Sequence, residues 1–155
     1  MKTKYVIGIF LILLIAATAC VYAAEATVDE YKFTIPDGFK IAENGDDIVT
    51  LQSTNDTRMM GVGIHKNSKI GDEAISNKLD DLEGRYNVTG NKTFQYEGKD
   101  IYEINYKTTD VQFKLYHWQM GDDWVAVTFA YPAEDDEIQW DDSPAKTVCD
   151  TLCEK

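Results

Sequence analysis

The chain has 155 residues, of which 44% are hydrophobic and 27% are charged, and its formal net charge at pH 7 is -12. This composition is typical of a globular protein and not of a disordered one. The length fits a leader followed by one domain. The acidic excess would repel phosphate backbones and anionic membrane surfaces, which argues against nucleic acid as a partner.

The N-terminal segment has the order of a secretory signal peptide. Lys2 and Lys4 precede an uncharged, mostly apolar run over residues 5–24 that ends in small residues. We expect residues 1–24 to be a signal peptide or an N-terminal membrane anchor, because about 20 apolar residues can span a bilayer. The residues before Cys20 partly fit a lipobox, so lipid attachment at Cys20 is a third alternative. Cleavage sites with small residues follow Ala19, Ala23 and Ala26. All these alternatives place the domain outside the cytoplasmic membrane, with the membrane contacted only through this segment.

Three Asn-x-Ser/Thr sequences occur after the leader. They begin at Asn55, Asn87 and Asn91. Outside the cytoplasm such sequences are candidate glycosylation sites, and they belong on the surface of the domain.

The first half of the domain has the pattern of short strands. Residues 31–35 alternate apolar and polar side chains and then reach the turn sequence Pro-Asp-Gly at 36–38. The Asn-Gly pair at 44–45 predicts a hairpin between the flanking apolar segments. Met60, Val62 and Ile64 predict a further strand, and the glycines between them suggest close packing there.

One helix is expected in the middle of the chain. Ile75, Leu79, Leu82 and Tyr86 recur at the spacing of a single helix face. Two acidic residues stand near its start, where the helix dipole favours negative charge.

Strands return over 94–131, followed by a closing helix. Residues 94–96 and 101–106 predict one hairpin, and the alternating segments 111–118 and 124–131 predict another. Ser143 and Pro144 form a helix start, as N-cap and first helical residue. Apolar residues on both faces of several strands indicate that helices cover part of each face. We therefore predict a single α+β domain over residues 27–155, with a mainly antiparallel sheet flanked by helices on both faces.

Residues 31–39, with the sequence YKFTIPDGF, resemble the opening strand and turn of PsbP-like domains. The order of elements over 27–153 is similar as well. This fold is shared with the bacterial DcrB lipoproteins. The resemblance implies a PsbP-like α/β/α sandwich and a mostly non-enzymatic domain that docks on larger assemblies.

Residues with reactive side chains give no catalytic, metal or cofactor site. Cys149 and Cys153 are four residues apart on one predicted helix face, where their side chains are poorly aimed for a disulfide. We expect free thiols, and a disulfide formed by fraying of the last helical turn is the alternative. His65 and His117 are the two histidines of the chain, and their spacing fits no zinc site. No phosphate-binding loop or nucleophile elbow is present.

Acidic residues gather in short groups, for example at 46–47, 122–123 and 134–137. Such groups leave two alternatives open. One is a weak calcium-dependent surface module, and the other is an exported hydrolase whose carboxylates meet only in the folded chain.

Trp118 and Trp124 flank one predicted turn, and tryptophan is enriched at interfaces. They are our candidates for a contact surface. The main prediction is therefore an exported, non-catalytic binding or assembly domain without a cofactor, with an unidentified protein or surface polymer as its partner.

Overall fold

The computed structural model describes residues 23–155. The predicted leader, apart from its last two residues, and Cys20 lie outside this range. None of the helices within the range is long and apolar enough to cross a membrane.

The domain is built from two antiparallel sheets and two α-helices. The large sheet has the order β3 (Phe39–Asn44), β4 (Ile48–Ser53), β5 (Met59–His65), β9 (Asp123–Pro132), β8 (Val111–Met120), β7 (Lys99–Lys107) and β6 (Asn87–Tyr96). The small sheet has the order β1 (Glu25–Val28), β2 (Tyr31–Thr34) and β10 (Cys153–Glu154). The helices are α2 (Asp72–Glu83), the single 3-10 turn η1 (Trp140–Asp142) and α3 (Pro144–Thr151). Each strand pairing is antiparallel, which confirms the predicted α+β class with a mainly antiparallel sheet.

Tight turns set the register of the hairpins. The β3–β4 pair closes at the predicted Asn44–Gly45 position. Between β6 and β7, Glu97 and Gly98 both have positive φ, 46° and 73°. Two consecutive positive φ values characterise a type I′ turn, whose twist matches that of the strands it joins.

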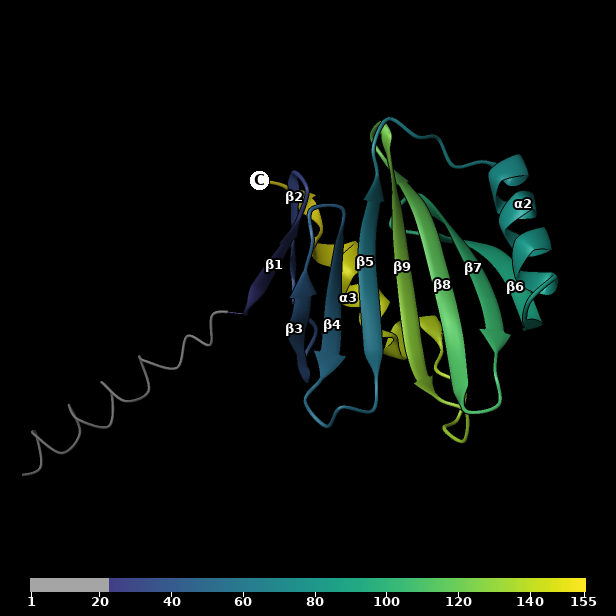
Figure 1. The fold of residues 1–155 in the computed structure, drawn as a ribbon. Helices are drawn as coiled ribbons and strands as arrows, with labels where there is room; N and C mark the ends of the chain where they lie inside the picture. Colours follow the sequence, from purple (N-terminus) through teal and green to yellow (C-terminus); the bar gives the residue numbers. More distant parts are fainter. Residues whose placement is uncertain (1–22) are drawn as a thin grey trace, which may run out of the picture.

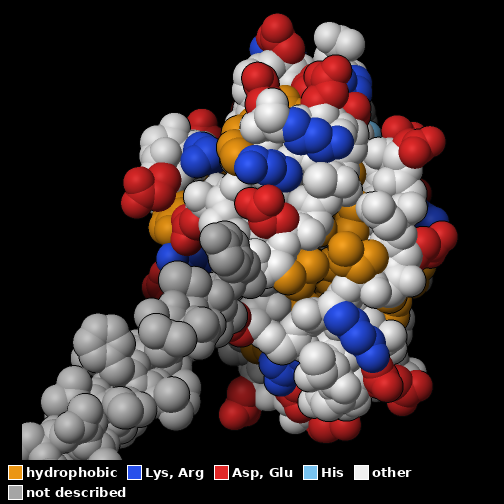
Figure 2. Space-filling view, turned by 90° about the vertical axis from the view of Figure 1, so that its left-hand side faces the viewer, with side chains coloured by type: hydrophobic (Ala, Val, Ile, Leu, Met, Phe, Trp, Pro, Cys, Tyr) orange, Lys and Arg blue, Asp and Glu red, His pale blue; other side chains and the backbone are white. Residues whose placement is uncertain are grey.

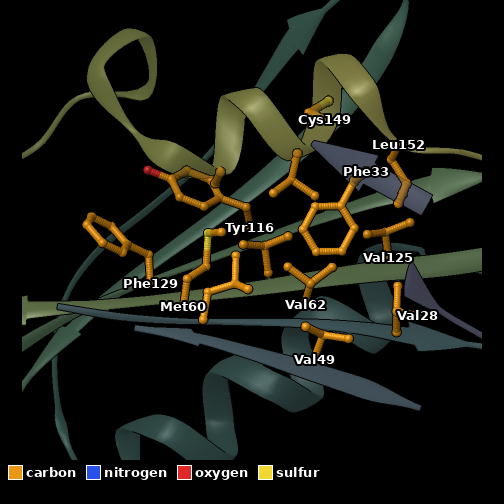
Figure 3. Packing of buried hydrophobic residues seen from close by; sticks show 14 of the residues in the cluster. Val28, Phe33, Val49, Met60, Val62, Tyr116, Val125, Phe129, Cys149 and Leu152 are labelled. Atoms are coloured by element: carbon orange, nitrogen blue, oxygen red, sulfur yellow. The ribbon is translucent and has the colours of Figure 1, made fainter. Parts of the chain in front are cut away.

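The main hydrophobic core lies between the large sheet, the small sheet and α3. Figure 3 shows Phe33 of β2 and Cys149 of α3 on the side of the large sheet where Val62 and Val125 lie, and all four residues belong to one cluster. These four side chains are each no more than 3% exposed. Ser143 caps α3 by accepting a hydrogen bond from the Ala145 N–H at 3.3 Å, as the sequence predicted.

A second, smaller hydrophobic cluster lies under α2. Leu82 of α2 packs there with Ile104 of β7 and Leu115 of β8. Leu115 and its neighbour Tyr116 belong to different clusters, because successive side chains of a strand point to opposite faces. In Figure 1, α2 lies beside β6 and β7, and no helix lies in front of β4, β5 and β9. One part of the large sheet is therefore left uncovered on the α2 side.

The structure differs from the sequence-based predictions in where some strands and helices begin and end, and in two short strands that were not predicted. β6 begins at Asn87, well before the predicted residue 94, because its polar N-terminal half lies at a sheet edge and carries no apolar alternation. α3 ends at Thr151, so Cys153 lies in β10, paired with Lys32, and not on the helix face of Cys149. β1 and β10 were not predicted, since two-to-four-residue strands give too short a pattern.

Candidate functional site

A groove opens on the uncovered part of the large sheet, next to α2. We call it the sheet groove; its volume is about 700 Å³, within the usual range for small-molecule sites. The residues that line it and matter for its chemistry are Ile48, Gly61, Gly63, His65, Lys78, His117, Trp124, Ala126 and Thr128.

The floor of the sheet groove consists of small side chains on β5 and β9. Gly61 pairs with Thr128, and Gly63 pairs with Ala126. These residues alternate with fully buried core residues such as Val62, so they face away from the core. The floor is low because four neighbouring positions carry little or no side chain.

The two floor glycines are not required by the backbone or by packing among the described residues. Neither has a positive φ. A Cβ atom at Gly61 would lie 3.5 Å from Ile48 Cδ1, and one at Gly63 would lie 3.6 Å from the Asp47 carbonyl oxygen, both ordinary van der Waals contacts. Ile48 and the Asp47 carbonyl oxygen thus lie close to the two glycines, as the prediction of close packing requires, but they leave room for a Cβ atom at either position. Glycine inside a strand lowers stability and often marks a place where a ligand or another chain approaches.

One wall of the sheet groove is an aromatic cluster around Trp124. The ring centroids of His65 and Trp124 are 4.9 Å apart, and those of His117 and Trp124 are 5.3 Å apart. The indole N–H of Trp124 donates a hydrogen bond to Nδ1 of His117 at 3.1 Å. The sequence placed the two histidines 52 positions apart with no shared motif; the β5–β9–β8 register brings both to the same indole.

His117 is neutral and has one unused polar atom. Its side chain is buried, and burial lowers the pKa of His117 to about 4, with the positive charge of Lys78 and the proximity of His65 acting in the same direction. Because Nδ1 accepts the Trp124 bond, the hydrogen-bond network assigns the ring proton to Nε2. Nε2 is buried and has no partner within residues 23–155. The wall of the groove thus contains an unpaired hydrogen-bond donor, which is costly unless something accepts it.

Two lysines border the sheet groove, and they differ in their partners. Lys66 Nζ lies 3.0 Å from carboxylate oxygens of both Glu30 and Asp123. Lys78 of α2 has no carboxylate within ion-pair distance in the described part of the chain. Lys78 therefore supplies a positive charge that is free to meet a ligand.

The structure separates the two predicted contact residues. Trp118 pairs with Val125, and Trp124 pairs with Gln119, so the two indoles lie on opposite faces of the sheet. Trp118 is completely buried in the main core. The prediction of Trp118 as a contact residue is wrong, because the strand alternation directs it inward although it lies near the hairpin end. Trp124 is half-buried and lines the sheet groove.

The three candidate glycosylation residues are exposed. Asn55 lies in the β4–β5 turn, where its Oδ1 accepts hydrogen bonds from the hydroxyls of Ser53 and Thr57. Asn87 and Asn91 lie on β6, which is an edge strand of the large sheet and not a turn.

Cys149, which is buried, and Cys153, which is exposed, are both free thiols. Burial raises the pKa of Cys149 to about 11, which makes it a poor nucleophile. Over residues 23–155, His, Cys, Asp and Glu side chains do not gather in groups of three or more that could hold a metal ion.

Two carboxylates that the fold brings together are held by Lys114. Lys114 Nζ lies 3.0 Å from Oε1 of both Glu103 and Glu137. The pairing with Lys114 lowers the pKa of Glu137, whereas a catalytic acid for glycoside hydrolysis needs a raised one. Glu103 and Glu137 therefore form an ion-pair cluster.

Asp123, from the acidic group at 122–123, joins three segments of the chain. Its carboxylate accepts hydrogen bonds from the Asn67 N–H at 2.9 Å, from Lys66 Nζ at 3.0 Å and from the Tyr31 hydroxyl at 2.8 Å. These bonds lower the pKa of Asp123. This residue fixes the β8–β9 turn, and with it Trp124, relative to the small sheet and the loop before α2.

No family model and no curated protein matches the chain. A crystal structure of a protein from Bacteroides thetaiotaomicron VPI-5482 is similar over 81% of this chain, with 16% sequence identity and a TM-score of 0.47. The aligned region spans 45% of that protein's length.

Proposed function

We propose that this protein is an exported, non-catalytic binding domain and that the sheet groove is its ligand site. The observation that carries the proposal is the groove with a glycine-containing floor beside a buried, unpaired hydrogen-bond donor. Both features reduce the stability of the isolated domain. A ligand that covered Gly61 and Gly63 and accepted a hydrogen bond from His117 would offset both costs.

The absence of catalytic geometry around the histidines supports a binding role. In the described chain, neither His65 nor His117 is hydrogen-bonded to a serine, threonine or cysteine side chain, and His117 bonds only to Trp124. A histidine that activates a nucleophile must lie within hydrogen-bond reach of it. At pH 7 His117 instead presents a fixed N–H donor.

Export rests on the order of basic, apolar and small residues in the segment 1–24. The surface is consistent with a domain in water: on the side drawn in Figure 2, acidic and basic side chains are interspersed around small hydrophobic areas. In that compartment Asn55, Asn87 and Asn91 would be open to glycosylation, and the bound group could belong to a small molecule, a protein or a surface polymer.

We also propose a PsbP-like α/β/α arrangement for residues 27–155. Its support is the packing of α2 on Leu115 and of α3 on the cluster that contains Tyr116, the next residue of β8. An experimental structure with both helices on one face of the large sheet would contradict it.

The ligand-site proposal is tested by filling the groove. Gly61→Val combined with Gly63→Val places branched side chains on the floor, where the present contacts of a Cβ are tolerable, and valine suits a strand. Gln52→Val is the matched control, because it adds valine to the neighbouring strand β4 outside the groove-lining residues.

The three proteins are incubated with a small-molecule extract of the native host's culture and analysed by native mass spectrometry. We expect a bound adduct on the wild type and on Gln52→Val, and none on the groove-filled variant. An adduct on all three, or on none, would refute the sheet groove as the ligand site.

A further inference from the structure

We infer that the sheet groove takes a small molecule with a single carboxylate and a flat apolar body. This inference rests on the proposed function and specifies the chemical class of its ligand.

The carboxylate is indicated by two donors in the lining of the groove that have no acceptor among the described residues. Lys78 on α2 has no ion-pair partner among residues 23–155, and the Nε2–H of His117 on β8 has no hydrogen-bond partner there. Both residues line the sheet groove. An anionic oxygen ligand would satisfy both, and charge-assisted hydrogen bonds of this kind are about twice as strong as neutral ones.

The acidic lining residue of the groove lies away from these donors. Asp47 is exposed in the turn between β3 and β4. In the order of the large sheet, β5 and β9 separate β4 from β8. The floor thus lies between an acidic side and a basic side, and an anion is favoured at the side of Lys78.

The apolar body is indicated by the floor and the wall. Gly61, Gly63 and Ala126 form a flat strip without polar side chains, with Thr128 at one end, and the half-buried Trp124 stands beside it. A flat ring placed on this strip would contact the indole, and aromatic pairs gain about 0.5–1.5 kcal/mol beyond the burial of area. A volume of about 700 Å³ accommodates a small molecule and not a folded partner.

The charge of the whole protein limits the ligand to one carboxylate. With a net charge of -12, the chain repels polyanions over roughly a Debye length of about 8–10 Å. A single carboxylate held between Lys78 and His117 meets local positive charge and donor groups, whereas a chain of acidic sugars would leave most of its charges facing an acidic surface.

The test compares 2-naphthylacetate with its neutral isostere 2-naphthylacetamide. Binding is followed by the NMR shifts of the Gly61 and Gly63 amides and of the Trp124 indole N–H. We expect the carboxylate to bind at least tenfold more tightly than the amide. Lys78→Met should abolish this preference, while Lys69→Met should keep it, because Lys69 pairs with Asp122 outside the groove.

Equal affinity for the two probes, or an unchanged preference in Lys78→Met, would overturn the carboxylate inference and leave the sheet groove as a ligand site. No shift of the floor amides with either probe would also overturn the inference. The proposed function is judged separately, by the adducts in the groove-filling experiment, so the two failures can be told apart.

Discussion

Acid should weaken this fold through one residue, His117. The pKa of His117 in the folded protein is lowered to about 4, mainly by burial, while an unfolded chain has an ordinary histidine pKa of about 6.5. Between these two values the unfolded state binds more protons than the folded state. The stabilising effect of a neutral His117 is therefore fully present above about pH 6.5 and is lost as the pH falls toward 4.

The size of the effect follows from the two pKa values. A difference between 6.5 and about 4 corresponds to roughly 3 kcal/mol of unfolding free energy, at about 1.4 kcal/mol for each pH unit. Domains of this size have total stabilities of about 5–15 kcal/mol. One buried histidine thus controls a large share of the stability between pH 7 and pH 4.

Urea unfolding followed by circular dichroism at pH 7, 6, 5 and 4 measures this effect. His117→Gln removes the titration while keeping a polar side chain beside Trp124. His65→Gln is the matched control, because His65 stacks on the same indole but is exposed. We expect the wild type and His65→Gln to lose about 3 kcal/mol more than His117→Gln between pH 7 and pH 4.

The carboxylates of the protein titrate equally in all three proteins, so the comparison isolates the histidine. If His117→Gln showed the same loss of stability as the wild type, His117 would not be held neutral by burial. The assignment of its Nε2 proton as a donor toward the sheet groove would then fail as well.

Three further results are expected. In a urea titration, Asp123→Asn should lower the unfolding free energy by about 2 kcal/mol, since hydrogen bonds to a charged group contribute roughly 1.5–3 kcal/mol. The control Asp122→Asn, at the exposed neighbouring residue, should change the unfolding free energy by less than about 0.5 kcal/mol. Trp118→Ala should cost about 3–5 kcal/mol by leaving a cavity in the main core, and a smaller loss measured by thermal unfolding would contradict its burial. A chain beginning at Thr27 should be less stable than one beginning at Ala24 by roughly 1–3 kcal/mol, because it lacks half of β1 and the buried Ala26. Equal denaturation midpoints for the two chains would show that β1 is dispensable.

Local sequence determined those features whose cause lies within a few residues. The Asn-Gly pair at 44–45 predicted a hairpin, and β3 and β4 do form one there, although neither residue has a positive φ. Ser143 followed by Pro144 specified the start of α3, since a hydroxyl caps the free N–H groups and proline needs none. The alternation in β8 and β9 specified strands with two apolar faces. Together these patterns were sufficient for an α+β class with a mainly antiparallel sheet.

Tertiary structure alone decided the candidate site. Nothing near Gly61 and Gly63 in the sequence indicates whether a helix covers them, because this depends on where the connection after β5 places α2. The face to which Trp118 points depends on the strand register, and a shift of one residue would reverse it. The approach of His65 and His117 to one indole requires β9 to lie between β5 and β8, a pairing between segments far apart in the chain. Short-range patterns cannot carry such information, so they indicated Trp124 as a candidate contact residue but did not indicate its neighbours.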